Sequence, residues 1–184
     1  MMRSTTAMLL ALLTACGCQP KRDERQGTRE MTTDSLAIEL SVDGKRIRAT
    51  LVNGTGDAVT ILHTARHQAC ELVLTDGEGH VLQPFDSRSI KKGDDTVYCT
   101  QLTEVAPGAR QLLFDGEFEE GDGGRRLEWG PFEFAKVASG RYRATVRWAA
   151  TAESCFDEDS MEEERPAGLW RGTLDSNEVT IDLD

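Results

Sequence analysis

From residue 35 onward, large apolar side chains recur at every second position in several separate stretches of the chain. In the clearest stretch, Tyr142, Ala144, Val146 and Trp148 alternate with Arg141, Arg143, Thr145 and Arg147. A period of two places successive side chains on opposite faces of a β-strand, so one face suits a core and the other suits water. Helical periodicity is scarce in the same region, and the pattern therefore predicts an all-β fold.

Residues 36–42, 47–51, 96–105, 111–118 and 179–183 are among the other expected strands. Turn signals separate the strands at intervals of about ten residues. Examples are Asp43-Gly44, the hairpin signal Asp76-Gly77-Glu78-Gly79, and Pro107-Gly108. Seven to nine short strands with this spacing are typical of an antiparallel, immunoglobulin-like β-sandwich. A small jelly roll or barrel is the alternative, because strand count alone does not set topology.

The first fifteen residues have the form of an export signal. Arg3 precedes a short apolar stretch, residues 7–13, which is too short to span the roughly 30 Å of hydrocarbon in a bilayer. The run Leu13-Thr14-Ala15-Cys16 resembles the lipobox of bacterial lipoproteins. That resemblance implies cleavage before Cys16 and lipid attachment at this residue, with two or more acyl chains giving stable anchoring to membrane lipid. The alternative is an ordinary signal peptide that leaves Cys16 and Cys18 as plain thiols.

The chain divides into three parts: a signal peptide (1–15), a flexible tether (16–34) and one folded domain (35–184). The tether is polar and lacks an apolar period, so it cannot bury enough surface to offset the entropy of ordering. The whole chain carries a formal charge of −11, and the domain itself holds 16 basic and 28 acidic residues, a net −12. Because phosphate neutralisation needs clustered Lys and Arg, nucleic acid is not an expected partner.

A weak family resemblance rests on turns and strand starts. These are the Asn53–Asp57 turn, the Asp76 hairpin, Pro107-Gly108 and the run Ser139–Arg143. Their order resembles the immunoglobulin-like domain of bacterial intracellular proteinase inhibitors of the BsuPI type, over about residues 36–184. The resemblance implies a sandwich fold and, as a function, protease inhibition by an inserted loop. The aromatic-acidic pair that this family has before the hairpin is replaced here by Cys70-Glu71.

Four cysteines follow Cys16, namely Cys18, Cys70, Cys99 and Cys155. An exported chain resides where disulfides persist, so pairing is expected, and four cysteines allow three complete pairings. If the strands run up and down in order, Cys70 and Cys99 lie at the same end of the sandwich, which favours a Cys70–Cys99 disulfide. Cys155 then pairs with Cys18, stays free, or replaces Cys99 as the partner of Cys70.

Two further patterns raise the question of metal binding. His63, His67 and Cys70 form an H-x3-H-x2-C run of residue types that zinc accepts, but the spacing indicates no fourth ligand. The acidic segments 115–122 and 153–164 offer oxygen ligands such as Asp157 and Asp159 for calcium, but the second lacks the glycine and spacing of a calcium loop. Solvated polar loops explain both patterns, so we expect no metal and no cofactor.

Sequence motifs for catalysis are also lacking, since there is no G-x-S-x-G elbow, H-E-x-x-H helix, phosphate-binding loop or dinucleotide fingerprint. We therefore expect a non-catalytic lipoprotein of the bacterial cell envelope, anchored outside the cytoplasm. In a Gram-negative cell, Gly17 in place of Asp after Cys16 indicates the outer membrane. Such a module would bind a protein or envelope component through loops 53–57, 76–79 and 149–168 at one end of the sandwich. Trp148, Phe156 and Trp170 are candidate contacts, although the alternation places Trp148 in the core; the proteinase inhibitor is the alternative function.

Overall fold

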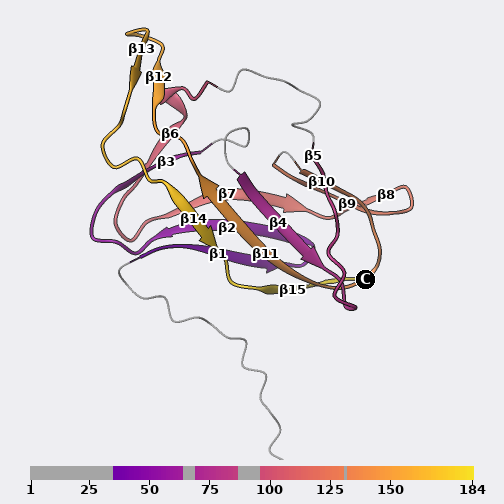
Figure 1. The fold of residues 1–184 in the computed structure, drawn as a ribbon. Helices are drawn as coiled ribbons and strands as arrows, with labels where there is room; N and C mark the ends of the chain where they lie inside the picture. Colours follow the sequence, from indigo (N-terminus) through magenta and orange to yellow (C-terminus); the bar gives the residue numbers. More distant parts are fainter. Residues whose placement is uncertain (1–34, 64–68, 87–95, 131) are drawn as a thin grey trace, which may run out of the picture.

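The computed structural model describes residues 35–63, 69–86, 96–130 and 132–184. The predicted signal peptide, the predicted tether and Cys16, the predicted site of lipid attachment, lie outside these ranges. Nearly every described element is a strand (Figure 1). The elements are β1 (Leu36–Asp43), β2 (Arg46–Asn53), β3 (Val59–Leu62), β4 (Ala69–Thr75), β5 (Phe85–Asp86), the 3-10 turn η2 (Cys99–Gln101), β6 (Leu102–Val105), β7 (Arg110–Glu117), β8 (Glu119–Gly121), β9 (Gly124–Trp129), β10 (Phe132–Val137), β11 (Gly140–Ala150), β12 (Cys155–Asp157), β13 (Glu162–Glu164), β14 (Gly172–Asp175) and β15 (Val179–Leu183).

One sheet has the strand order β1-β2-β7 and is antiparallel throughout. The apolar residues of its alternation, such as Leu40, Ile47 and Leu51, are buried. The intervening Arg46 and Arg48 stay on the outer face beside Asp115. The period of two in the sequence thus becomes one buried face and one charged face, as predicted.

A second sheet is built around the long central strand β11. β4 pairs along one side of it, while β15 pairs with its first half and β14 with its second half on the other side. Tyr142, Ala144, Val146 and Trp148 are all buried, and the arginines between them face outward. This strand confirms the prediction drawn from the alternation of residues 141–148.

A third sheet, of order β5-β10-β9-β8, packs beside the first. Two glycines allow close backbone approaches, Gly116 where β7 crosses β9 and Gly124 within the third sheet, where β9 meets β10. A Cβ on Gly116 would lie 2.7 Å from the carbonyl oxygen of Glu128, so only glycine lets β7 cross β9 so closely. A Cβ on Gly124 would lie 2.8 Å from the carbonyl carbon of Lys136, in a bulge where Lys136 adopts a left-handed conformation with φ 58°. Both contacts are between backbones, which leaves no flexible side chain to move aside.

The inner faces of these sheets share one hydrophobic core, with Trp129, Phe134 and Trp148 as its largest fully buried side chains. A polar side chain binds the outer edge of the first sheet. The amide of Asn177 donates to the carbonyl oxygen of Leu40 in β1 (3.0 Å) and accepts from its N–H (2.8 Å). The all-β sandwich is confirmed, with several short strands in addition to the long ones that the sequence predicts.

Candidate functional site

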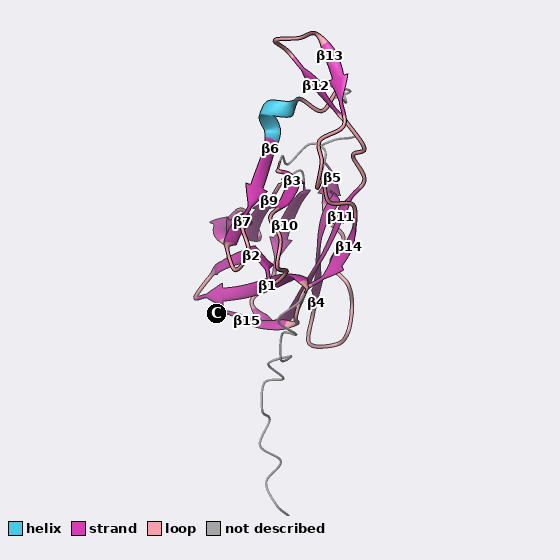
Figure 2. Cartoon of the chain, turned by 90° about the vertical axis from the view of Figure 1, so that its left-hand side faces the viewer, coloured by secondary structure: helices cyan, strands magenta, loops and turns pink. Residues whose placement is uncertain are grey.

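Within the described ranges, residues 153–164, which we call the acidic hairpin, stand clear of the sheets in both views. Figure 2 shows β12 and β13 projecting beyond η2 at the end of the molecule where β11 finishes. The two strands pair Cys155 with Glu164 and Asp157 with Glu162. Their turn is closed by the carboxylate of Asp157, which accepts the N–H of Asp159 (3.1 Å). At the tip, Met161 has φ 58° and is 70% exposed.

The hairpin is joined to the sandwich by a disulfide between Cys99 and Cys155. Beside it, the N–H of Phe156 donates to the carbonyl oxygen of Val97 (2.7 Å), and the rings of Tyr98 and Phe156 meet edge to face at 6.3 Å. Of residues 155–164, only Cys155 is buried, at 2% exposure. A two-stranded hairpin without a core is at best marginally stable, so these few contacts hold it in place.

The predicted Cys70–Cys99 disulfide is wrong, because Cys70 is a free thiol in the core. Cys70 shares a face of β4 with Leu72 and Leu74, and all three side chains are buried. Cys99 lies in η2 rather than at the start of a strand, and there it faces Cys155. Burial raises the pKa of the Cys70 thiol to about 12, which makes it a poor nucleophile and a poor metal ligand. Cys18, the other partner considered for Cys155, lies outside the described residues.

The zinc pattern of His63, His67 and Cys70 does not assemble in the part that can be assessed. His63 places its Nε2 3.2 Å from the carbonyl oxygen of Leu113, and Cys70 is buried in the core on β4, whereas His67 lies outside the described residues. No group of three or more His, Cys, Asp or Glu side chains within the described ranges is arranged to hold a metal ion. Asp157, considered above for calcium, directs its carboxylate at the backbone of its own turn.

The two acidic segments of the sequence have different surroundings. In the first, Asp115 pairs with Arg46 and lies near Arg48, while Glu120 pairs with Lys45 and with the buried Arg125. In the acidic hairpin, Glu153 pairs with Arg171, but no basic side chain of the described residues pairs with Glu162, Glu163 or Glu164. The hairpin holds seven acidic and no basic residues, so it carries an uncompensated negative charge.

The predicted contact loops do not share one end of the sandwich. In the β4–β11 pair, Thr75 faces Arg143 near the start of β11 and Ala69 faces Ala149 near its finish. The 76–79 turn therefore lies at the end of the molecule opposite the acidic hairpin (Figure 1). The 53–57 turn leads into β3, which contacts the segment returning from the hairpin, residues 165–171. There the backbone N–H of Thr60 donates to the carbonyl oxygen of Gly168 (3.1 Å).

Asn53, at the start of that turn, is fully buried and serves the fold. Its amide nitrogen donates to the carbonyl oxygens of Asp57 and Val105 (2.9 Å each), and its oxygen accepts from the N–H and the hydroxyl of Thr55. This side chain joins the end of β2 to the 53–57 turn and to the end of β6, and all of its polar atoms are bonded within the protein. The sequence identified the turn but gave no sign that its first residue is buried.

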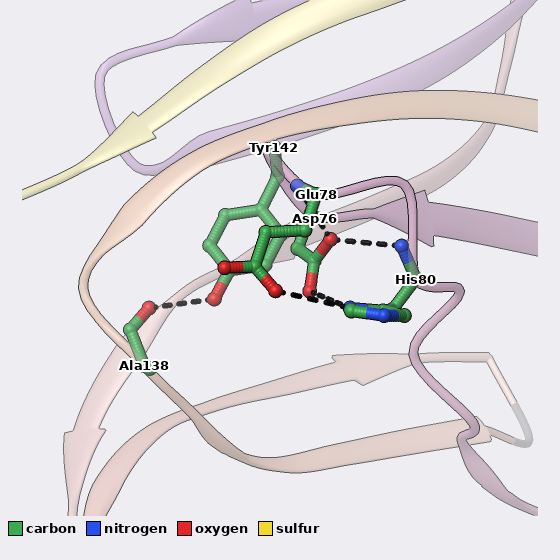
Figure 3. Close-up of polar contacts among 5 residues, drawn as sticks. All are labelled: Asp76, Glu78, His80, Ala138 and Tyr142. Carbon is green, nitrogen blue, oxygen red and sulfur yellow. Dashed lines mark hydrogen bonds and ion pairs between the residues drawn. The ribbon is translucent and has the colours of Figure 1, made fainter.

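The 76–79 turn is organised by one carboxylate (Figure 3). Asp76 accepts the N–H groups of Glu78 (2.9 Å) and His80 (2.8 Å), and its second oxygen lies 3.2 Å from Nδ1 of His80. Mainly the hydrogen bond from the His80 N–H holds the pKa of Asp76 below its usual range. The neighbouring hydroxyl of Tyr142 donates to the carbonyl oxygen of Ala138 (2.9 Å), and burial raises the pKa of Tyr142. Because that hydroxyl is engaged elsewhere and the His80 side chain is 72% exposed, the arrangement acts as a turn brace.

The aromatic residues proposed as contacts point inward instead. Trp148 is fully buried, in agreement with its place in the alternation, and Trp170 stacks on it with ring centroids 4.8 Å apart. Phe156 is half-buried against Tyr98. A hollow of about 240 Å³ beside Tyr142 is bordered by the Lys136 bulge and Leu82, and its walls are as polar as they are apolar.

Comparisons with family models, with curated proteins and with solved structures find no match to this chain. Among the described residues, no helix has the length and hydropathy needed to cross a bilayer.

Proposed function

We propose that the protein is a lipid-anchored binding module of the bacterial cell envelope, without a catalytic role, that contacts its partner through the acidic hairpin. The observation that carries this proposal is the disulfide-braced projection of residues 153–164 beyond the sandwich. None of residues 153–164 belongs to the hydrophobic core cluster, so apart from its disulfide the hairpin contributes little to folding. Its rigid attachment instead presents a defined surface to the surroundings.

The negative charge of the acidic hairpin indicates which kind of partner it can bind. The carboxylates of Glu162, Glu163 and Glu164 are exposed, and no basic side chain of the described chain pairs with them. Such a surface attracts basic groups over a distance of about a Debye length, or roughly 8 Å at physiological ionic strength. A partner with a Lys- or Arg-rich patch, either a protein or a cationic envelope component, is the best match.

The anchor is part of the proposal and rests on the sequence Leu13-Thr14-Ala15-Cys16. Acylation at Cys16 would hold the domain at the membrane surface through the tether, which is residues 16–34. Mass spectrometry of the protein extracted from membranes should find an acylated amino terminus at Cys16. An unmodified terminus would remove the anchor and leave the binding function to be tested separately.

The binding function is tested by crosslinking in the native envelope. A photoreactive residue at Glu163 should capture a protein partner, whereas one at Val81, which is 50% exposed at the opposite end, should not. Replacing Glu162, Glu163 and Glu164 by Gln should weaken capture. The matched control replaces Glu117 and Glu119 by Gln and Asp122 by Asn, which removes the same charge from the first acidic segment and should leave capture intact. Equal capture from both ends, or none, would refute the proposal.

A proteinase inhibitor is the second candidate, favoured by the same braced projection and by the resemblance noted above. Met161 at the tip has a left-handed conformation, unlike the extended backbone that binds along a sheet edge. Incubation of the purified domain with serine, cysteine and metalloproteases separates the two candidates. Inhibition at micromolar concentration that is lost on replacing Met161 would favour the inhibitor.

A further inference from the structure

The contacts that join the acidic hairpin to the sandwich converge on three consecutive residues. Val97 accepts a hydrogen bond from Phe156, Tyr98 packs against the Phe156 ring, and Cys99 forms the disulfide with Cys155. Cys155 is the one buried residue of 155–164, so the buried part of this stretch is the disulfide cysteine itself.

The two sides of this link are anchored unequally. On the Cys99 side, the carbonyl oxygen of Gln101 accepts the N–H of His63 (3.2 Å), and β6 continues from η2 into four residue pairs with β3. On the Cys155 side, β12 is followed by β13 and an exposed return segment. Firm contact with the sandwich resumes at Gly168, whose carbonyl oxygen accepts the N–H of Thr60 (3.1 Å). It continues at Trp170, whose N–H donates to the carbonyl oxygen of Thr60 (2.8 Å) and whose ring stacks on Trp148.

We propose that the Cys99–Cys155 disulfide is a redox latch: its reduction releases the acidic hairpin while the sandwich stays folded. Before reduction the disulfide also holds the hairpin at its base, and afterwards the hairpin is held firmly only where the chain joins the sandwich, at the end of β11 (Ala150, paired with Gly172) and from Gly168 onward. Release would disperse the carboxylates that the latch holds in one place and so weaken binding of a partner. This consequence rests on the proposed function.

The chemistry requires a dithiol reductant. A thiolate of the reductant attacks the Sγ of Cys99, which is half-buried, whereas Cys155 is 2% exposed. The S–S bond breaks, Cys155 leaves as a thiolate and takes up a proton, and a mixed disulfide remains on Cys99. The second thiolate of the reductant then attacks the reductant's own sulfur, and Cys99 leaves and is protonated. Two electrons pass from the dithiol, which becomes a disulfide, to the two cysteines.

The third described cysteine does not interfere with this exchange. Cys70 is fully buried, and so it is accessible neither to the reductant nor to the exposed hairpin. The latch is therefore confined to one pair, and it opens and closes without rearrangement to another pairing among the described cysteines.

Hydrogen–deuterium exchange of the full chain, with and without dithiothreitol, tests the latch. After reduction, amides of residues 156–164 should take up deuterium about tenfold faster or more. At the same labelling times, amides of 143–149 in β11 should remain protected, and the near-ultraviolet dichroism of the buried Trp129 and Trp148 should be retained. The double substitution Cys99→Ala with Cys155→Ala should reproduce the reduced pattern without a reductant. The control Cys70→Ala should respond to reduction as the parent protein does.

Two outcomes would overturn the latch. One is equal deuterium uptake by residues 156–164 in both redox states, and the other is loss of protection in β11 together with the hairpin. Because the exchange experiment needs no partner, it can fail while crosslinking at Glu163 succeeds. A failed crosslink with a released hairpin would refute the binding function and leave the latch standing.

Discussion

The two acidic segments look alike in the sequence but differ in the folded protein. In the segment Asp115–Asp122, carboxylates pair with arginines on neighbouring strands, and Phe118 at its centre is 2% exposed. In the acidic hairpin, burial is confined to Cys155, and Glu162–Glu164 meet no basic side chain of the described chain. The first segment is therefore part of the architecture, and the second is attached to it.

The role of an acidic residue depends more on its neighbours in the fold than on the number of acidic residues beside it in the sequence. Arg46 and Arg48 lie on the outer face of β2, where the register places Asp115 opposite Arg48. The acidic hairpin pairs with itself, and one of its three cross-strand pairs, Asp157 with Glu162, places an acid opposite an acid. Like charges placed this way are mutually destabilising, which explains why this hairpin depends on a covalent brace.

Truncating the phenylalanine of each segment gives the largest expected contrast. Phe118→Ala should lower the free energy of unfolding by about 3–5 kcal/mol, because it leaves a cavity in the core. Phe156→Ala removes a half-buried ring from one edge-to-face pair and should cost about 1 kcal/mol or less. Chemical denaturation of both variants measures the difference. Equal losses would mean that the acidic hairpin is as integral to the fold as β8 and β9 are.

Removing the disulfide should have the next largest effect. The two cysteines are 56 residues apart, and closing a loop of this size stabilises a fold by up to about 4 kcal/mol in the chain-entropy model. Cys99→Ala with Cys155→Ala should therefore lower the free energy of unfolding by roughly 2–4 kcal/mol. Cys70→Ala, which removes only a buried thiol, should cost about 1 kcal/mol. If Cys70→Ala were the costlier change and non-reducing peptide mapping joined Cys70 to another cysteine, the observed pairing would be wrong.

Much of the fold could be predicted from the sequence because the long strands have one apolar face. The alternation placed β1, β2, β7, β11 and β15 to within a few residues. It failed where other forces decide the structure. The expected strand 96–105 begins as the turn η2, because the Gln101 side chain accepts the N–H of Tyr98 (3.0 Å) and closes a 3-10 turn. The strands β12 and β13 were missed, since a run of glutamates has low strand propensity and no apolar period.

The candidate site was harder to predict, although one signal was present. Cys70 stands two residues before Leu72 and four before Leu74, so the same alternation assigns it to the buried face of β4. Cys99 and Cys155 lie in polar, irregular surroundings, where a disulfide can contribute most. The register of β4 against β11, which separates the 76–79 turn from the acidic hairpin, follows from pairing between distant strands and has no local signal.

A smaller effect comes from the charge on Asp115. Nε of Arg46 donates to this carboxylate at 2.7 Å, and that bond holds the pKa of Asp115 below its ordinary value of 3.8. A carboxyl whose pKa is lowered by folding stabilises the protein fully above its unfolded pKa, and this contribution disappears as the pH falls through the folded pKa. Asp115→Asn should therefore cost about 0.5–1 kcal/mol at pH 7, a value typical of exposed ion pairs, and almost nothing near pH 2. Glu163→Gln should cost nothing at either pH, as denaturation at the two pH values will show; a matching loss at pH 7 would remove the distinction between the segments.

The smallest expected effect is on the pKa values of Asp115 and Asp157, which are lowered by different hydrogen-bond donors. The pKa of Asp157 in the acidic hairpin is also lowered, but mainly by the backbone N–H of Asp159 and then by the side chain of Ser160. These donors belong to the same turn, whereas the donor to Asp115 comes from another strand. Titration followed by carbon-detected NMR should therefore find that Arg46→Met raises the pKa of Asp115 and leaves that of Asp157 unchanged, while Ser160→Ala does the reverse. Reduction of the disulfide should leave the pKa of Asp157 low, because the turn carries its own hydrogen bonds into the released hairpin. A rise on reduction would show that the brace shapes the turn as well as holding it.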